Sequence, residues 1–187
     1  MTRRIVVAIT GASGATYGVR VLELLRRQDG IETHLIISAA GRTTIGIELD
    51  VSVADVEALA DQVHATRDIA ASISSGSFAT AGMIVAPCSI KSLSAIANSY
   101  SADLISRAAD VTLKERRPLV LMVRETPLHL GHLRLMTQVA EIGAVVYPPV
   151  PAFYNKPESL DDVVTHTAGR ALEPLGVMVD EVNRWSG

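Results

Sequence analysis

Residues 4–18, RIVVAITGASGATYG, constrain the fold more than any other part of the chain. A β-branched apolar run ends at Thr10 and leads through glycine and other small residues into an amphipathic stretch. This order predicts a buried strand, a tight turn and the start of a helix. Because residues 11–14 carry no large side chain, the backbone N–H groups at the helix start are accessible, and the helix dipole favours an anion there. We therefore expect a phosphate group above this turn.

The loop differs from two better-known phosphate-binding motifs. No Lys-Ser or Lys-Thr pair follows the glycines, which excludes the P-loop of nucleoside triphosphatases. The glycines stand at positions 11, 14 and 18, and the second predicted strand ends at Ser38 without the carboxylate that binds an adenosine ribose. A mononucleotide such as FMN therefore fits better than NAD. A tight turn that binds no ligand remains the alternative.

Strand-like apolar runs alternate with helix-like segments along the chain. The runs cover residues 5–9, 33–37, 83–86, 119–123 and 144–147. Capping-box patterns that begin at Ser52 and Ser159 predict two helix starts, and residues 130–142 predict a helix that ends at Gly143. With 48% hydrophobic residues, this alternation predicts a single Rossmann-like (flavodoxin-like) α/β domain over residues 1–187, with a mostly parallel sheet and helices on both faces.

The composition excludes several classes of function. A net charge of −3 gives no attraction to nucleic acid, and the mixed cluster at residues 114–117 is typical of a helix C-terminus. The single cysteine, Cys88, excludes an internal disulfide and is typical of a reducing compartment. Thr10 interrupts the N-terminal apolar run before it reaches the length of a signal peptide, and no run is long enough to span a bilayer. We expect a soluble, cytoplasmic protein.

The segments that follow the predicted strands are rich in polar and charged side chains. In a parallel α/β sheet the ligand lies beyond the carboxyl ends of the strands, so these segments are the place to look for a site. They are residues 10–14, Ser38, residues 87–92, residues 124–127 and residues 148–156. Ser89 is expected to cap a helix and so to present hydroxyl and N–H groups to a flavin. Cys88 has no base assigned to it and is expected to pack in the core.

Arg124 and Glu125 stand at the end of a predicted buried strand, so their side chains point in opposite directions. A salt bridge with a neighbouring loop is one interpretation. Lys114, Arg170 and Tyr154 supply further groups suited to a phosphate dianion, and a carboxylate beside them can move protons to or from that phosphate. We expect no metal, because the pair His129-x-x-His132 has no third ligand and no His-Glu-x-x-His pattern, and both are expected to be structural.

Five segments together closely resemble the UbiX family of flavin prenyltransferases. They are TGASG from Thr10, PCS from Pro87, AADVTLKERRPLVL from Ala108, RETPL from Arg124 and PAFY from Pro151. The resemblance runs from the first strand to Trp185 and is most specific in LKERRPL and RETPL. The family joins a dimethylallyl group from dimethylallyl monophosphate to N5 and C6 of reduced FMN, without a metal. The product, prenylated FMN, is used by UbiD-type decarboxylases, and the family assembles as dodecamers.

The resemblance assigns roles to individual residues. It implies an FMN site made of Gly11, Ala12, Ser13, Ser38, Ser89, Ile90, Lys91, Ser92 and Arg124. It implies a site for the prenyl phosphate at Tyr154 and Arg170, with Lys114 beside them. Further active-site positions are Glu48, Arg107, Glu125 and Trp185, some of them reached from a neighbouring subunit.

In this chemistry an allylic C–O bond breaks, and the departing phosphate must be stabilised. We expect Lys114, Arg124, Arg170 and Tyr154 to do so, Ser13 to lie near the flavin N5, and Glu125 to assist acid–base transfer. Glu48 is a further candidate catalytic residue.

Other functions remain to be weighed. A short-chain dehydrogenase would need a Tyr-x-x-x-Lys pair, and a flavin-dependent cysteine decarboxylase would need a Pro-x-Met-Asn motif after the fifth strand; neither is present. An FMN-binding partner subunit of an aromatic acid decarboxylase, without its own transferase activity, is the alternative. The sequence leaves open whether the donor is a mono- or a diphosphate, and whether the pathway is ubiquinone biosynthesis or aromatic acid decarboxylation.

Overall fold

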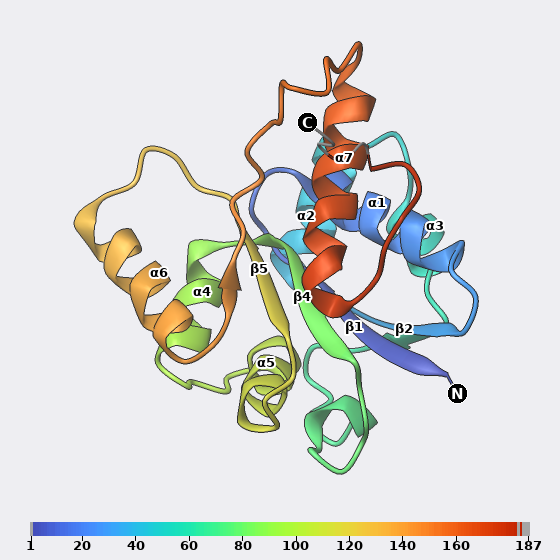
Figure 1. Ribbon diagram of the computed structural model, residues 1–187. Helices are drawn as coiled ribbons and strands as arrows, with labels where there is room; N and C mark the ends of the chain where they lie inside the picture. Colours follow the sequence, from blue (N-terminus) through green and yellow to red (C-terminus); the bar gives the residue numbers. More distant parts are fainter. Residues whose placement is uncertain (1, 183, 185–187) are drawn as a thin grey trace.

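The computed structural model describes residues 2–182 and residue 184, and a parallel sheet runs through its centre (Figure 1). The strands are β1 (Arg3–Ile9), β2 (Ile31–Ile37), β3 (Gln62–His64), β4 (Gly82–Cys88), β5 (Leu119–Val123) and β6 (Val145–Val146). Their order is β3-β2-β1-β4-β5-β6, and every neighbouring pair is parallel. The order reverses between β1 and β4, which is where α/β sheets of this kind place their ligand.

Within the described residues, seven α-helices cover the sheet. They are α1 (Ala15–Arg26), α2 (Ala39–Glu48), α3 (Val53–Glu57), α4 (Ile90–Ala97), α5 (Leu104–Lys114), α6 (Leu130–Glu141) and α7 (Leu160–Leu172), and short 3-10 helices span Ser72–Ser74 and Glu173–Leu175. Buried residues of α1, α2, α3 and α7 pack on one face of the sheet, and those of α4, α5 and α6 pack on the other.

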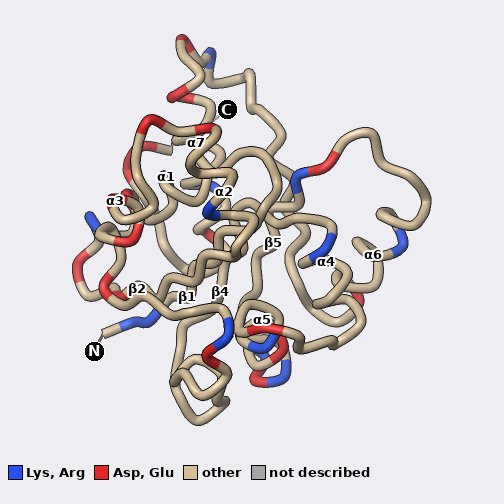
Figure 2. The backbone as a smooth tube through the Cα atoms, turned by 180° about the vertical axis from the view of Figure 1, so that it is seen from behind, with Lys and Arg blue, Asp and Glu red and all other residues tan. Residues whose placement is uncertain are grey.

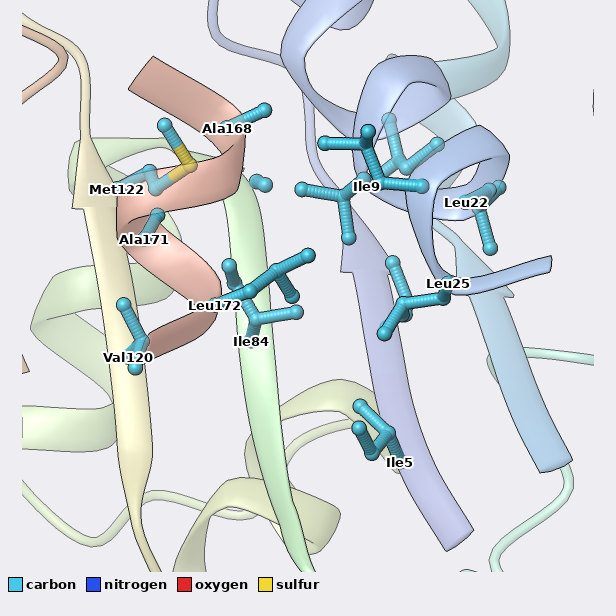
Figure 3. Packing of buried hydrophobic residues seen from close by; sticks show 14 of the residues in the cluster. Ile5, Ile9, Leu22, Leu25, Ile84, Val120, Met122, Ala168, Ala171 and Leu172 are labelled. Carbon is cyan, nitrogen blue, oxygen red and sulfur yellow. The ribbon is translucent and has the colours of Figure 1, made fainter. Parts of the chain in front are cut away.

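Alternating side chains along the strands separate these two cores. In β1, Ile5 and Ile9 belong to the core under α1 and α7, whereas Val6 and Ala8 belong to the core under α4 and α5. Figure 3 shows Ile5 and Ile9 on the same side of the sheet as the buried leucines of α1. Since both faces are buried, the strands are apolar throughout, and this explains why they appear in the sequence as continuous hydrophobic runs.

The predicted fold class is confirmed, and all five predicted strands are present. The helix starts at Ser52 and Ser159 are confirmed as capping boxes, and α6 ends before Gly143, which adopts a positive φ of 101°. The sequence did not predict β3, because its three residues include only one apolar side chain and lie at the edge of the sheet. In the part of the chain that the structure describes, no helix has both the length and the hydropathy to cross a membrane.

Candidate active site

Thr10 joins the loops that follow β1 and β4. Its side chain is almost fully buried, at 1% exposure. The hydroxyl donates a hydrogen bond to the carbonyl oxygen of Pro87 at 2.7 Å and accepts one from the backbone N–H of Ser89 at 2.8 Å. On the other side, the N–H of Ser38 donates to the carbonyl of Ile9 at 3.0 Å. The ends of three strands are therefore fixed to one another at the point where the strand order reverses.

Thr10 was not among the predicted site residues. The signal that could have found it is a hydroxyl placed directly at the end of an otherwise apolar strand. A buried polar group of this kind must find hydrogen-bond partners, and the nearest are the backbone groups of the neighbouring strand ends.

A cavity of about 830 Å³ lies between the N-termini of α2 and α4. Among the predicted flavin residues, Gly11, Ser38, Ser89, Lys91 and Ser92 line it. Ser38 caps α2 by accepting from the N–H of Gly41 at 2.9 Å, and Ser89 caps α4 by accepting from the N–H of Ser92 at 3.3 Å. Two helix N-termini at one cavity favour an anionic group there. The prediction that Ser89 caps a helix is confirmed.

The cavity also has lining residues that the sequence analysis missed. They include Thr66 and Arg67 after β3, and Asn98, Tyr100, Asp103 and Ser106 around the start of α5. Because β3 was not predicted, the segment after it was not recognised as one of the loops at the carboxyl edge of the sheet. Arg67 places a second cation, besides Lys91, around this cavity.

The carboxylate of Glu48, the last residue of α2, lies at the N-terminus of α1. Its Oε2 accepts hydrogen bonds from the backbone N–H groups of Gly14 at 2.8 Å and Ala15 at 2.9 Å. Burial raises the pKa of the Glu48 carboxyl, but hydrogen bonds from Ser13, Gly14 and Ala15 and the charge of Arg124 outweigh it, so the pKa lies below the ordinary value. Gly14 precedes the helix with a φ of 104°, which favours glycine.

This arrangement corrects the first expectation drawn from the glycine loop. The structure places a side-chain carboxylate, that of Glu48, at the helix start where the loop alone predicts a phosphate. This contact depends on the tertiary structure, because Glu48 is the last residue of α2 and lies 34 residues after Gly14 in the chain. The paired helix starts of α2 and α4 offer the nearby alternative position for a phosphate.

Arg124 and Glu125 follow β5 at the same edge, and both are exposed. The backbone N–H of Arg124 donates to the carbonyl of Cys88 at 3.1 Å, and its charge acts on Glu48. The Glu125 carboxylate instead accepts a hydrogen bond from the N–H of Thr126 at 3.0 Å, within its own loop. Arg124 therefore contributes to the electrostatic surroundings of Glu48.

Tyr154 and Arg170 lie in a second cluster, beyond the end of β6. The Tyr154 hydroxyl is 3.3 Å from Nε2 of His166 on α7, and Arg170 forms an ion pair with Glu173. Burial raises the pKa of Tyr147; the charge of Arg170 lowers it, and the charges of Glu173 and Tyr154 raise it. The two residues predicted to bind the prenyl phosphate are thus brought together around Tyr147. Neither Tyr147 nor His166 was identified from the sequence.

Lys114 does not lie beside Tyr154 and Arg170 in this chain, so that expectation is corrected. It is the last residue of α5, immediately before the segment that enters β5 at its amino end, and it pairs with Glu115. The candidate site lies at the carboxyl ends of the strands, so about the length of a strand separates it from Lys114. Figure 2 shows Lys and Arg next to Asp and Glu around α5, as the mixed cluster at residues 114–117 predicts.

Arg107 lies on α5 as well, away from Tyr154. Its guanidinium donates to the carbonyl of Ser74 at 3.1 Å and pairs with Asp110 at 3.0 Å. Of the remaining predicted residues, Ile90 packs against the core under α4, Ala12 lies in the loop after β1, and Trp185 lies outside the described residues.

His129, His132 and Cys88 make contacts typical of residues that stabilise the fold. Nδ1 of His129 accepts from the N–H of Gly131 at 3.0 Å and so caps α6, and its ring packs on that of His132. Cys88 is fully buried, and burial raises the pKa of its thiol to about 12. Within residues 2–182 and residue 184, three or more His, Cys, Asp or Glu side chains do not come together in a way that would hold a metal ion.

Comparisons with known proteins show the family of this chain. The Flavoprotein family model matches residues 1–172. The chain is 62% identical to the flavin prenyltransferase UbiX of Escherichia coli strain K12 over 187 residues, which cover 99% of each protein. It superposes with a TM-score of 0.98 on the crystal structure of AnUbiX (PadA1) in complex with FMN and dimethylallyl pyrophosphate, at 52% identity over 100% of this chain and 99% of that one.

A second solved structure is the dodecameric FMN-dependent UbiX-like decarboxylase from Escherichia coli O157:H7. The TM-score is 0.96 at 48% identity, over 98% of this chain and 100% of the other. Identity at this level over the full length, together with the match to the family model, assigns the family. The chain belongs to the UbiX family of flavin prenyltransferases.

Proposed function

We propose that this protein joins a dimethylallyl group from a dimethylallyl phosphate ester to N5 and C6 of reduced FMN, and so makes prenylated FMN. One observation carries the proposal. The cavity at the N-termini of α2 and α4 and the cluster of Tyr154 and Arg170 both follow the carboxyl ends of strands, so one edge of the sheet offers places for two phosphate esters.

The cavity between α2 and α4 is the proposed FMN site. Its volume of about 830 Å³ falls in the range of small-molecule sites. The FMN phosphate binds where Ser38 and Ser89 cap their helices, and the Lys91 ammonium group neutralises part of its negative charge. The isoalloxazine ring then extends toward Ser13 and Glu48, and the Ser13 hydroxyl serves as the hydrogen-bond partner of N5.

The donor phosphate binds at Tyr154 and Arg170. When the allylic C–O bond breaks, its electron pair stays on the phosphate, and the growing negative charge is stabilised by the Arg170 guanidinium and the Tyr154 hydroxyl. The allyl carbon bonds to N5, which loses its proton. The remaining allyl double bond then takes up one proton, its electrophilic carbon bonds to C6, and C6 loses its own proton. The bound phosphate accepts and returns these protons, with Glu125 assisting, and one proton is released overall. Arg124 adds positive charge on the flavin side.

Arg107 and Lys114 would reach Tyr154 and Arg170 from another copy of the chain. In their own chain both are on α5, which packs on the opposite face of the sheet from α7, and Lys114 lies at the amino end of β5. We therefore propose that the protein works as a homo-oligomer, and that a dodecamer like that of the Escherichia coli O157:H7 relative is its assembly. Exposed apolar side chains on α6 and in the loop after β6, such as Leu130 at 61% and Phe153 at 73% exposure, are suited to such contacts.

Three further statements belong to the proposal. Residues 1–187 form one flavoprotein domain, of which the family model matches residues 1–172. The product passes to a UbiD-type decarboxylase. The enzyme works in the cytoplasm, where the single unpaired Cys88 stays reduced.

The test is an anaerobic reaction of the purified protein with reduced FMN and either dimethylallyl monophosphate or dimethylallyl diphosphate. Mass spectrometry should show a flavin heavier by one dimethylallyl group with at least one donor. Glu125→Gln should form this product more slowly; an unaltered rate would remove Glu125 from the mechanism. FMN that binds but gains no mass with either donor would support the alternative function, an FMN-binding partner subunit of a decarboxylase.

A further inference from the structure

We infer that His166 is a positioning residue for the prenyl donor, and that it acts by donating a hydrogen bond to the Tyr154 hydroxyl. The inference rests on the proposed function, because it concerns the phosphate that Tyr154 would bind. It adds a residue to that site and states which atom of the residue matters.

Tyr154 needs an anchor, because its loop has no helix or strand to hold it. The residue is 48% exposed and lies between β6 and α7. Its hydroxyl oxygen is 3.3 Å from Nε2 of His166, and the two rings meet edge to face, with centroids 5.8 Å apart and an angle of 82° between their planes. A contact through both the ring and the hydroxyl fixes the direction of the phenol as well as its place.

His166 is itself held rigidly. It is 6% exposed and lies in the middle of α7. The helix is anchored by Ala168, Ala171 and Leu172, which pack against Met122, Ile84 and their neighbours in the sheet (Figure 3). The hydrogen bond thus transmits the position of a packed helix to a side chain on an exposed loop.

The protons of this pair determine what Tyr154 can offer to a ligand. A phenol has one O–H, which can donate either to His166 or to a phosphate oxygen, but not fully to both. If Nε2 of His166 carries the proton, it donates to the Tyr154 oxygen and leaves the phenol O–H for the phosphate. Binding of an anion favours this arrangement, because it places hydrogen-bond donors toward the negative charge.

The spacing along α7 connects this pair to the second phosphate-binding residue. His166 and Arg170 are four residues apart in the same helix and so lie on the same face, one turn from each other. Anchoring Tyr154 on His166 therefore holds its hydroxyl near the turn that carries the Arg170 guanidinium. Together they can bind one phosphate group from two directions.

The experiment compares two substitutions of similar size and shape. His166→Gln keeps an N–H donor at the end of the side chain, whereas His166→Met removes it. Each holoenzyme is assayed anaerobically with saturating reduced FMN and varied dimethylallyl monophosphate, and FMN affinity is measured separately. We expect His166→Met to raise KM for the donor about five- to tenfold, the effect of one hydrogen bond, with unchanged FMN affinity. His166→Gln should restore most of the donor affinity.

A second arm separates positioning from a merely structural role. In a Tyr154→Phe background the hydroxyl is absent, so His166→Met should cause no further rise in KM. A structural role would give the same additional loss in both backgrounds and would also weaken FMN binding. Urea unfolding confirms that each variant is folded. His166→Gln alone suffices if His166→Met does not fold, because a donor-retaining variant that loses donor affinity overturns the inference.

The outcomes also distinguish this inference from the proposed function. If the unaltered protein makes no prenylated flavin with either donor, the proposed function fails, and this inference fails with it. If the unaltered protein is active but the Gln and Met variants have the same KM for the donor, only the inference is overturned.

Discussion

Replacing Thr10 with valine should loosen the connection between the loops that follow β1 and β4, which border the proposed flavin site. Valine has nearly the same shape but lacks the hydroxyl that donates to Pro87 and accepts from Ser89. Two hydrogen bonds are lost at about 1 kcal/mol each, and the partly buried N–H of Ser89 is left without this acceptor, which costs about 1–3 kcal/mol. Because these estimates overlap, we expect Thr10→Val to lower the free energy of unfolding by about 2–4 kcal/mol.

The matched control is Thr10→Ser, which keeps the hydroxyl and loses only a methyl group, at a cost of about 1 kcal/mol. Urea unfolding followed by circular dichroism, at one protein concentration for all variants, measures the stability, and quenching of flavin fluorescence measures FMN affinity. Thr10→Val should also weaken FMN binding, because Ser89 both caps α4 and lines the cavity. The reasoning is refuted if valine and serine at this position give the same stability and the same FMN affinity.

Three further predictions concern buried groups and helix packing. Cys88, whose burial raises its thiol pKa to about 12, should resist alkylation at pH 8 in the folded protein and react only with added urea; rapid alkylation without urea would contradict this. Nδ1 of His34 and Nε2 of His64 are joined by a hydrogen bond of 2.9 Å, and burial is the main cause that lowers the pKa of both imidazoles. As the pH falls, the unfolded chain therefore binds protons at these two residues before the folded protein does. The free energy of unfolding should therefore be highest above about pH 6.5 and should fall as the pH is lowered below this value, by up to about 1.4 kcal/mol per pH unit for each imidazole. The double substitution His34→Gln with His64→Gln removes both rings and should make the free energy of unfolding less dependent on pH in this range. A Cβ at Gly18 in α1 would lie 2.3 Å from a backbone oxygen of β4, so Gly18→Ala should destabilise the fold by about 1–3 kcal/mol in urea unfolding, whereas Gly46→Ala in α2, where a Cβ meets nothing within 4 Å, should be neutral or stabilising by up to about 1 kcal/mol; equal effects would contradict the packing argument.

Much of the fold follows from local patterns in the sequence. The strands are apolar on both faces because helices cover both faces, and this makes them visible as continuous runs. Helix starts are visible where a side chain caps its own helix, as Ser52, Ser89 and Ser159 do, because that interaction spans only three residues. The edge strand β3 was not predicted, because three residues with one apolar side chain form too short a hydrophobic pattern to indicate a strand.

The site was predictable only in part, for the same reason. Ser38 and Ser89 could be assigned to one cavity because parallel strands bring their carboxyl ends to one edge. The sequence could not indicate that Glu48 reaches across from the end of α2 to the start of α1, because two elements must first pack before the carboxylate meets those N–H groups.

The sequence by itself determined the order and kind of the elements, the helix caps, the edge of the sheet that carries the chemistry and the family. Only the tertiary structure decided which distant groups meet there: Thr10 with Ser89, Glu48 with Gly14, and Tyr154 with His166. It also decided that Lys114 lies at the far end of its own chain's sheet. The physical reason is that periodicity and capping act over a few neighbouring residues, whereas these contacts join positions 12 to 79 residues apart and exist only after the helices have packed on the sheet.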